Sequence, residues 1–117
     1  MAIEVPKEAE EQVVRLQQYQ QQFQMLNSQK QNIQVQLIEI DHSLDHLNKV
    51  VNEDTYEIVG TIMIKREKEE LINDLNERKS NLDLRNSVIS KQVDKISKKL
   101  NDIQEKIMKI VNKEKNK

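Results

Sequence analysis

The sequence predicts an all-α dominated fold: a long antiparallel coiled-coil helical hairpin with one short β-hairpin at its connection. Two stretches of similar length repeat apolar residues at heptad spacing, and one β-branched insert separates them. The composition agrees, because 36% hydrophobic and 3% aromatic residues suit a narrow coiled-coil seam better than a thick globular core. With one glycine and one proline in 117 residues there are few turn signals, so we expect a single domain.

The first helix is expected at about residues 7–52. Pro6 fits a first helical turn, and Glu8 and Glu10 are favourable near the positive end of the helix dipole. Apolar residues then alternate in steps of four and three, which is the a/d spacing of a coiled coil. Only a lysine interrupts the series, which runs Tyr19, Phe23, Leu26, Lys30, Ile33, Leu37, Ile40, Leu44, Leu47 and Val51.

The second helix is expected at about residues 66–113, with the same spacing. Its series is Ile72, Leu75, Lys79, Leu82, Asn86, Ile89, Val93, Ile96, Leu100, Ile103, Ile107 and Ile110. We hypothesise that its polar members, Lys79 and Asn86, fix the register of the pair. Charge also favours antiparallel pairing, because Met1–Glu57 holds ten acids and four bases and Lys91–Lys117 holds four acids and nine lysines.

The connection at about residues 53–65 contains the stretch "TYEIVGTIMI". β-branched and aromatic residues around Gly60 predict a β-hairpin, and the alternative is an apolar loop. One small exposed hairpin cannot bury so many apolar groups, and both of its edges are open. We therefore expect hairpins from several subunits to pair in an obligate oligomer. The candidate assembly residues are Tyr56, Ile58, Val59, Gly60, Ile62, Met63 and Ile64.

Two heptad arms joined by "YEIVGTIMIKREKEEL" resemble the β-type subunit of prefoldin. The residues that match the family's central pattern are Tyr56, Val59, Gly60, Ile62, Ile64 and Lys65. The glutamine-rich "RLQQYQQQFQML" and the later "LDLRNSVISKQVDKISKKL" are similar to archaeal members, so the resemblance covers nearly the whole chain. It implies a hexamer of two α and four β subunits, with a double β-barrel body and six coiled-coil arms. It also implies nucleotide-independent capture of unfolded proteins between the arm tips and their transfer to a chaperonin.

In that architecture both chain termini lie at the distal tips, where a holdase needs exposed apolar groups. The candidate client-binding residues are Val5, Val13, Val14, Leu16, Ile107, Met108 and Val111. The heptad falters here, because the steps from Val13 to Leu16 and from Leu16 to Tyr19 are both three residues. Met108 and Val111 fall outside the a/d series. The alternative is that these residues, Leu16 and Ile107 above all, only close the end of the coiled coil.

The leading function is thus an ATP-independent chaperone subunit, and the alternative is a structural coiled-coil adaptor or spacer that docks one partner through its hairpin. A nucleic-acid-binding hairpin using Lys91–Lys117 is disfavoured, because the net charge is −1 and these lysines lack interleaved aromatics. A prion-like role for the glutamines is disfavoured by the heptads that run through them.

Other classes find little support. There is no cysteine for disulfides or thiol chemistry, and one glycine cannot form a phosphate-binding loop. His42 and His46 have the spacing of zinc ligands on a helix, but no third ligand is placed by spacing. We therefore expect no enzyme, cofactor or metal. No apolar run reaches transmembrane length and Met1–Glu11 lacks a signal-peptide core, so we expect a cytoplasmic protein without membrane contact.

Overall fold

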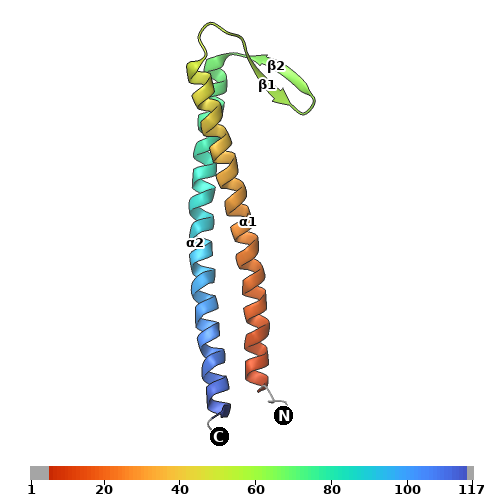
Figure 1. Cartoon of the computed structure of the whole chain (residues 1–117), viewed down its shortest axis with the longest axis vertical. Helices are drawn as coiled ribbons and strands as arrows, with labels where there is room; N and C mark the ends of the chain where they lie inside the picture. The colour runs from red at the N-terminus through yellow and green to blue at the C-terminus, as the bar shows by residue number, and fades with distance from the viewer. Residues whose placement is uncertain (1–5, 116–117) are drawn as a thin grey trace. The chain divides into compact units, whose positions relative to one another are not determined.

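The computed structural model describes residues 6–115 and contains two helices and two strands (Figure 1). Their order is α1 (Lys7–Lys49), β1 (Thr55–Val59), β2 (Ile62–Arg66) and α2 (Lys68–Lys115). α1 ends at Lys49 rather than at residue 52, and β2 extends to Arg66, so α2 begins at Lys68 rather than at residue 66. The fold class predicted from the sequence, two long helices with one antiparallel β-hairpin between them, is confirmed.

The chain divides into two compact units. The terminal unit is Met1–Lys30 with Ile89–Lys117, and the hairpin unit is Gln31–Val88. Each unit contains part of α1 and part of α2, which lie side by side and run antiparallel. The hairpin unit also contains both strands.

Local chemistry explains the helix ends. The carbonyl of Pro6 accepts a hydrogen bond from the Glu10 amide at 3.1 Å, so the proline opens α1 without leaving a donor unpaired. After Lys49 the chain turns through Asn52, whose φ of 60° is left-handed, a conformation that asparagine tolerates better than most residues. Lys68 Nζ donates to the Val50 carbonyl at 2.7 Å and so satisfies one of the free carbonyls at the end of α1.

The seam between the helices follows the predicted heptads. We assign position a to Leu37 and Asn86 and number the heptads of each helix from there. Every a and d residue from Ala9 to Leu47 and from Ile72 to Ile110 is buried or half-buried. The most buried are Ala9, Ile33, Ile40, Leu82, Ile89, Ile96 and Ile103. Within each unit, such a seam excludes water between the two helices and supplies hydrophobic stabilisation.

The structure extends the predicted seam at the N-terminal end of α1 and corrects it at the other end. Toward the N-terminus it continues from Leu16 through Gln12 to Ala9, so a glutamine takes the position that neither Val13 nor Val14 can occupy. At the other end the placement of Val51 in the seam is wrong, since Val51 is 72% exposed. The reason is that α1 ends at Lys49, which takes Val51 out of the helical phase and leaves Val50 half-buried instead.

Strands β1 and β2 pair antiparallel, with Val59 opposite Ile62 next to the turn. The two-residue connection is Gly60-Thr61, and Gly60 has a φ of +60°. Positive φ at the first but not the second central residue is typical of a type II′ turn, whose twist matches that of the strands. Glycine is favoured there because an L side chain is strained at this φ.

Arg66, the last residue of β2, fastens the hairpin to α2. Its Nη1 donates to Glu57 Oε2 at 2.6 Å and its Nη2 donates to Asp74 Oδ2 at 2.7 Å. These two hydrogen bonds, to Asp74 first and to Glu57 second, raise the pKa of the Arg66 guanidinium above its ordinary value. The Thr55 hydroxyl donates to the Arg66 carbonyl at 2.6 Å and ties β1 to the same point. The base of the hairpin is therefore held by one fork of charge-assisted bonds.

Candidate assembly and client-binding surfaces

The β-hairpin is apolar on both of its faces. Residues alternate between the faces of a strand, and residues paired across strands share a face. The pairs Tyr56–Lys65 and Ile58–Met63 therefore define one face, and Glu57–Ile64 and Val59–Ile62 define the other. A hairpin that packed on its own helices alone would need one apolar face only. Two apolar faces indicate that both must be covered.

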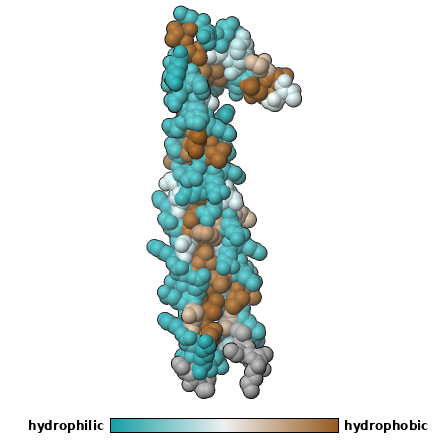
Figure 2. All heavy atoms as spheres, in the orientation of Figure 1, coloured by the Kyte–Doolittle hydropathy of each residue, from teal (hydrophilic) through white to brown (hydrophobic). Residues whose placement is uncertain are grey.

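Within residues 6–115, the large apolar side chains of both faces are left uncovered. The predicted assembly residues other than the turn glycine are all exposed, by fractions from 43% for Ile64 to 74% for Ile58. Figure 2 shows apolar side chains gathered over the outer part of the hairpin. So much exposed apolar surface on a two-stranded element is typical of a surface that another chain covers. The structure thus brings the seven predicted assembly residues together on one projecting element.

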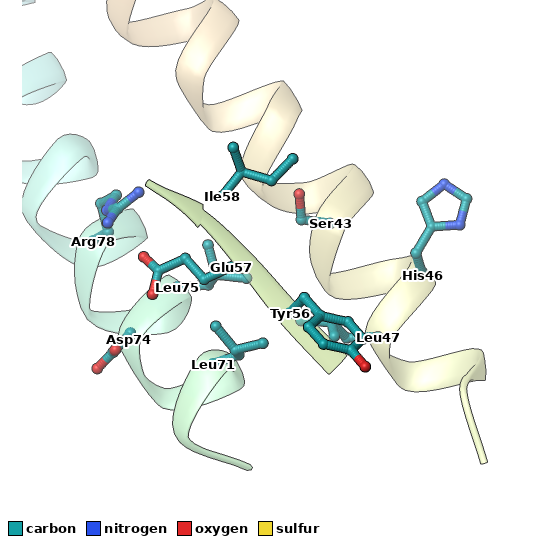
Figure 3. A pocket seen from close by; sticks show the side chains of 10 residues that line it. All are labelled: Ser43, His46, Leu47, Tyr56, Glu57, Ile58, Leu71, Asp74, Leu75 and Arg78. Carbon is teal, nitrogen blue, oxygen red and sulfur yellow. The ribbon is translucent and has the colours of Figure 1, made fainter. Parts of the chain in front are cut away.

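A groove of about 450 Å³ separates β1 from the two helices of the hairpin unit (Figure 3). Its apolar lining is Leu47 from α1, Tyr56 and Ile58 from β1, and Leu71 and Leu75 from α2. Ser43, His46, Glu57, Asp74 and Arg78 supply its polar rim. Leu71 lies at a g position, outside the seam, yet it is only 8% exposed, and it lines this groove together with Tyr56 and Ile58. The groove therefore lies next to the exposed apolar residues Tyr56 and Ile58 of the hairpin.

At the far end of the terminal unit, the side chains that leave the seam are exposed. Val13 is 37% exposed, Val14 is 53% exposed and Met108 is 61% exposed. They are exposed because Ala9 and Gln12 fill the seam positions of α1, while Ile107 and Ile110 fill those of α2. Val111 is half-buried beside them. These four residues form what we call the tip patch: Val13, Val14, Met108 and Val111.

The other predicted client-binding residues differ. Leu16 and Ile107 are half-buried at a positions, so their main contacts are those of the seam. Val5 lies outside the described residues. Sequence reasoning also missed exposed apolar residues along the helix flanks, namely Met25, Val35, Ile38, Leu84 and Val88. Their b, c and f positions in the heptad could have indicated their exposure. However, scattered exposed apolar residues are common on protein surfaces.

Comparisons with known proteins agree with this geometry. The chain matches the family described as "Prefoldin subunit" over residues 10–114. It is 36% identical over 115 residues to prefoldin subunit beta of Saccharolobus islandicus, covering 97% of this chain and 90% of the relative. It is 30% identical over 110 residues to prefoldin subunit beta of Archaeoglobus fulgidus, covering 93% of this chain and 95% of the relative. The chain belongs to the prefoldin subunit family.

A solved structure indicates the class of prefoldin subunit. The crystal structure of the prefoldin beta subunit from Thermococcus strain KS-1 superposes with a TM-score of 0.82 at 28% identity. The match covers 91% of this chain and 94% of that one. With the beta relatives, this superposition identifies a β-class prefoldin subunit and confirms the resemblance seen in the sequence. Prefoldin is a family of chaperones rather than of enzymes.

The polar seam residues of this prefoldin subunit behave differently from each other. Lys79 Nζ forms an ion pair with Asp41 Oδ1 at 2.8 Å, and this hydrogen bond raises the pKa of Lys79 above its ordinary value of 10.5. In contrast, the buried Oδ1 of Asn86 accepts no hydrogen bond, and neither does the buried Oε1 of Gln12. Lys79 can therefore help to fix the register, while Asn86 costs stability where it lies.

Residues 6–115 of this prefoldin subunit contain no group of three or more side chains suited to hold a metal ion. His42 and His46, the pair with zinc-ligand spacing, are both exposed on α1. Within the same residues, neither helix has a window apolar enough to cross a membrane.

Proposed function

We propose that this chain is the β-type subunit of a hetero-hexameric prefoldin that holds unfolded proteins without nucleotide and passes them to a chaperonin. Two α-type and four β-type subunits would form the hexamer, and their hairpins would pair into a shared β-barrel. We also propose that the chain acts in the cytoplasm, as expected from the sequence. We propose no cofactor and no enzymatic activity, in keeping with the family.

The assembly step is supported by the two apolar faces of the hairpin. All six of its large apolar residues are exposed, and the strands leave unpaired backbone groups at both edges. Edge-to-edge pairing with neighbouring hairpins would satisfy these groups, and closure of the joined strands into a barrel would bury apolar side chains inside it. Light scattering on the isolated chain at micromolar concentration should therefore detect an oligomer. A chain that stays a folded monomer both alone and with an α-type partner would contradict the assembly role.

The client-binding step rests on one observation, the exposed tip patch. Val14 and Met108 are more than half exposed at the end of a coiled coil whose seam is already filled. The flexible thioether of Met108 suits contact with many different sequences. We propose Val13, Val14, Met108 and Val111 as the client-binding residues. Leu16, Ile107 and Val5 remain candidates from the sequence, of which the first two mainly close the seam.

The rival function is a structural adaptor that docks one partner through the hairpin. An adaptor needs no exposed apolar residues at its far end, so the tip patch favours the chaperone. The test is an aggregation assay on a chemically unfolded protein without ATP, with this chain alone and with an α-type partner. We expect the assembled complex to suppress aggregation. No suppression in either form would contradict the proposal and favour the adaptor.

A further inference from the structure

The two faces of the terminal unit that flank the seam differ in chemistry. In an antiparallel helix pair the g positions of both helices meet on one face and the e positions meet on the other. The structure identifies the g face directly. A groove there is lined by Gln22, Met25 and Leu26 of α1 and by Gln92, Lys95, Ile96 and Lys99 of α2, which occupy d, g and c positions. The e positions therefore lie together on the opposite face.

Every e position of the terminal unit is uncharged. We call this set the uncharged face: Val13, Gln20, Asn27, Ser90, Ser97, Gln104 and Val111. Three of these residues are small and half-buried beside the seam: Asn27, Ser90 and Ser97. The adjoining b positions add Gln17, Gln24, Asn101 and Met108, with Glu10, Asp94 and Lys115 as the bordering charges.

The g face is different, because it carries many charges. Its g positions hold Glu8, Arg15, Lys99, Lys106 and Lys113 in addition to glutamines, and its c positions add Glu11, Lys95, Asp102 and Lys109. Lys99 Nζ lies 5.4 Å from the centre of the Tyr19 ring on this side. A segment that docks on the g face must match or desolvate these charges, which is costly for an uncharged chain.

Three of the four tip-patch residues lie on or beside the uncharged face, whereas Val14 is at an f position. Val13 and Val111 are themselves e residues, and Met108 is the adjoining b residue of α2. The contact between Tyr19 and Lys99 indicates how the two antiparallel helices align along their axes. With this alignment, residue 105 lies opposite Val13. At 1.5 Å per residue, Met108 is then only about 4.5 Å farther along the axis than Val13. The two helices thus contribute apolar groups to one end of one face.

We propose that unfolded clients dock along the uncharged face as extended segments of low charge. Their apolar side chains contact the tip patch, and their backbone hydrogen-bonds to the amides and hydroxyls farther along. Glutamine and asparagine both donate and accept hydrogen bonds, so they can pair with any backbone regardless of client sequence. This inference rests on the proposed function, since it assigns the face on which that function acts.

The lack of charge at the e positions favours a client segment of low charge. The segments of unfolded chains that aggregate combine apolar residues, high β-propensity and low net charge. Such a segment meets no unpaired charge at the e positions of the terminal unit, whereas the lysines of the g face suit an acidic partner. A face without charge also repels neither acidic nor basic flanking sequence, so it tolerates many clients.

The test places a photo-reactive amino acid at matched glutamines in the complex of this chain with its α-type partner. Gln20 and Gln104 are on the uncharged face, whereas Gln22 and Gln92 are on the g face, and all four are exposed on helices. With an unfolded, low-charge test protein, we expect strong cross-linking from Gln20 and Gln104 and little from Gln22 and Gln92. Equal yields, or stronger yields from Gln22 and Gln92, would overturn the inference.

A second pair of variants measures the energetic effect. Gln20→Lys with Gln104→Lys should weaken client binding by about tenfold, because a client segment would have to desolvate the new charges. Gln22→Lys with Gln92→Lys adds the same charge to the other face and should change binding little. Equal effects of the two pairs would overturn the inference and leave the proposed function standing. A wild-type complex that binds no client would overturn both.

Discussion

Lys79 and Asn86 are polar residues in an otherwise apolar stretch of the α2 seam, and the structure gives them different roles. Lys79 reaches Asp41 on the other helix, so its charge is paired in this alignment. A shift by one heptad would remove that partner. The side-chain oxygen of Asn86 accepts no hydrogen bond in the present alignment. The hypothesis that polar seam residues fix the register is therefore supported for Lys79 only.

Asn86→Leu should raise the free energy of unfolding by about 1–2 kcal/mol, because it removes a buried oxygen without a hydrogen bond and adds apolar contact. Thermal unfolding followed by circular dichroism measures the change. Asn81→Leu is the matched control, since Asn81 is exposed on the same helix. A lower melting temperature for Asn86→Leu would show that the amide has a partner in solution and would contradict this account.

The Lys79–Asp41 pair should stabilise the fold only while Lys79 is charged. Because the pKa of Lys79 is raised in the folded chain, this contribution is fully present below its ordinary value of 10.5 and is lost as the pH rises through the raised value. Wild type should therefore melt above Asp41→Asn at pH 8, and the gap should narrow above pH 10.5. Glu39→Gln, on an exposed position of α1, should show no such narrowing.

At the scale of elements, the β-hairpin depends on two points, its anchor at Arg66 and its turn at Gly60. The anchor joins β1, β2 and α2 through one guanidinium. The turn depends on one left-handed residue. Each can be substituted without changing the exposed large apolar residues. Such variants therefore test the geometry of the hairpin separately from the chemistry of its surface.

Arg66→Ala should loosen the hairpin from α2 while leaving the helices paired. The expected result is faster amide hydrogen exchange in β1 and β2, with unchanged protection near Ile89 and Ile96, which hydrogen–deuterium exchange by mass spectrometry can measure. Lys65→Ala is the control, because Lys65 makes only an exposed ion pair with Asp54 at 3.3 Å. Equal exchange in wild type and Arg66→Ala would show that the guanidinium does not anchor the hairpin.

Gly60→Ala should destabilise the hairpin by about 1 kcal/mol through backbone strain alone. A Cβ at this position would meet no atom within 4 Å, so a clash cannot be the cause. Gly60→Asn should cost less, because asparagine tolerates positive φ. The measurement is the concentration at which the proposed oligomer dissociates, followed by light scattering. If the alanine and asparagine variants dissociate at the same concentration, backbone strain is not the determinant.

Much of this organisation could be predicted from the sequence, and the exceptions have physical causes. The a/d periodicity predicted the seam because each buried position recurs every heptad, and it failed at Val51 because a helix end depends on capping contacts such as Lys68 to Val50. The exposed apolar residues of the hairpin were predicted, because a short hairpin beside a narrow coiled coil cannot bury them. The Arg66 fork was not, since it joins residues whose spacing carries no pattern.

The terminal unit shows the same limit. The faltering heptad near Val13 indicated that some valines must leave the seam, but not which residue would replace them. Gln12 does so, with a buried oxygen that lacks a partner, and Val13 and Val14 become exposed. A glutamine inside the seam with two valines outside it lowers stability. A function for the exposed valines would explain why the chain has this arrangement.

At the scale of the whole molecule, we propose different roles for the two units. The hairpin unit would use its two-faced apolar element for assembly, and the terminal unit would use its exposed apolar groups and uncharged face to bind clients. Neither role needs a catalytic group or a bound cofactor. Both require other chains, so the isolated subunit should be less active than the assembled complex.

The most direct test of the central claim is suppression of aggregation by the assembled complex, without nucleotide, using two matched sets of substitutions. One set removes apolar groups from the tip patch: Val14→Ser, Met108→Ser and Val111→Ser. The control set removes exposed apolar groups elsewhere: Val35→Ser, Ile38→Ser and Val88→Ser. Both complexes should have the wild-type mass, but only the tip set should lose suppression of an unfolded test protein. Equal suppression by the two sets would contradict the claim that this chain holds clients at its tip.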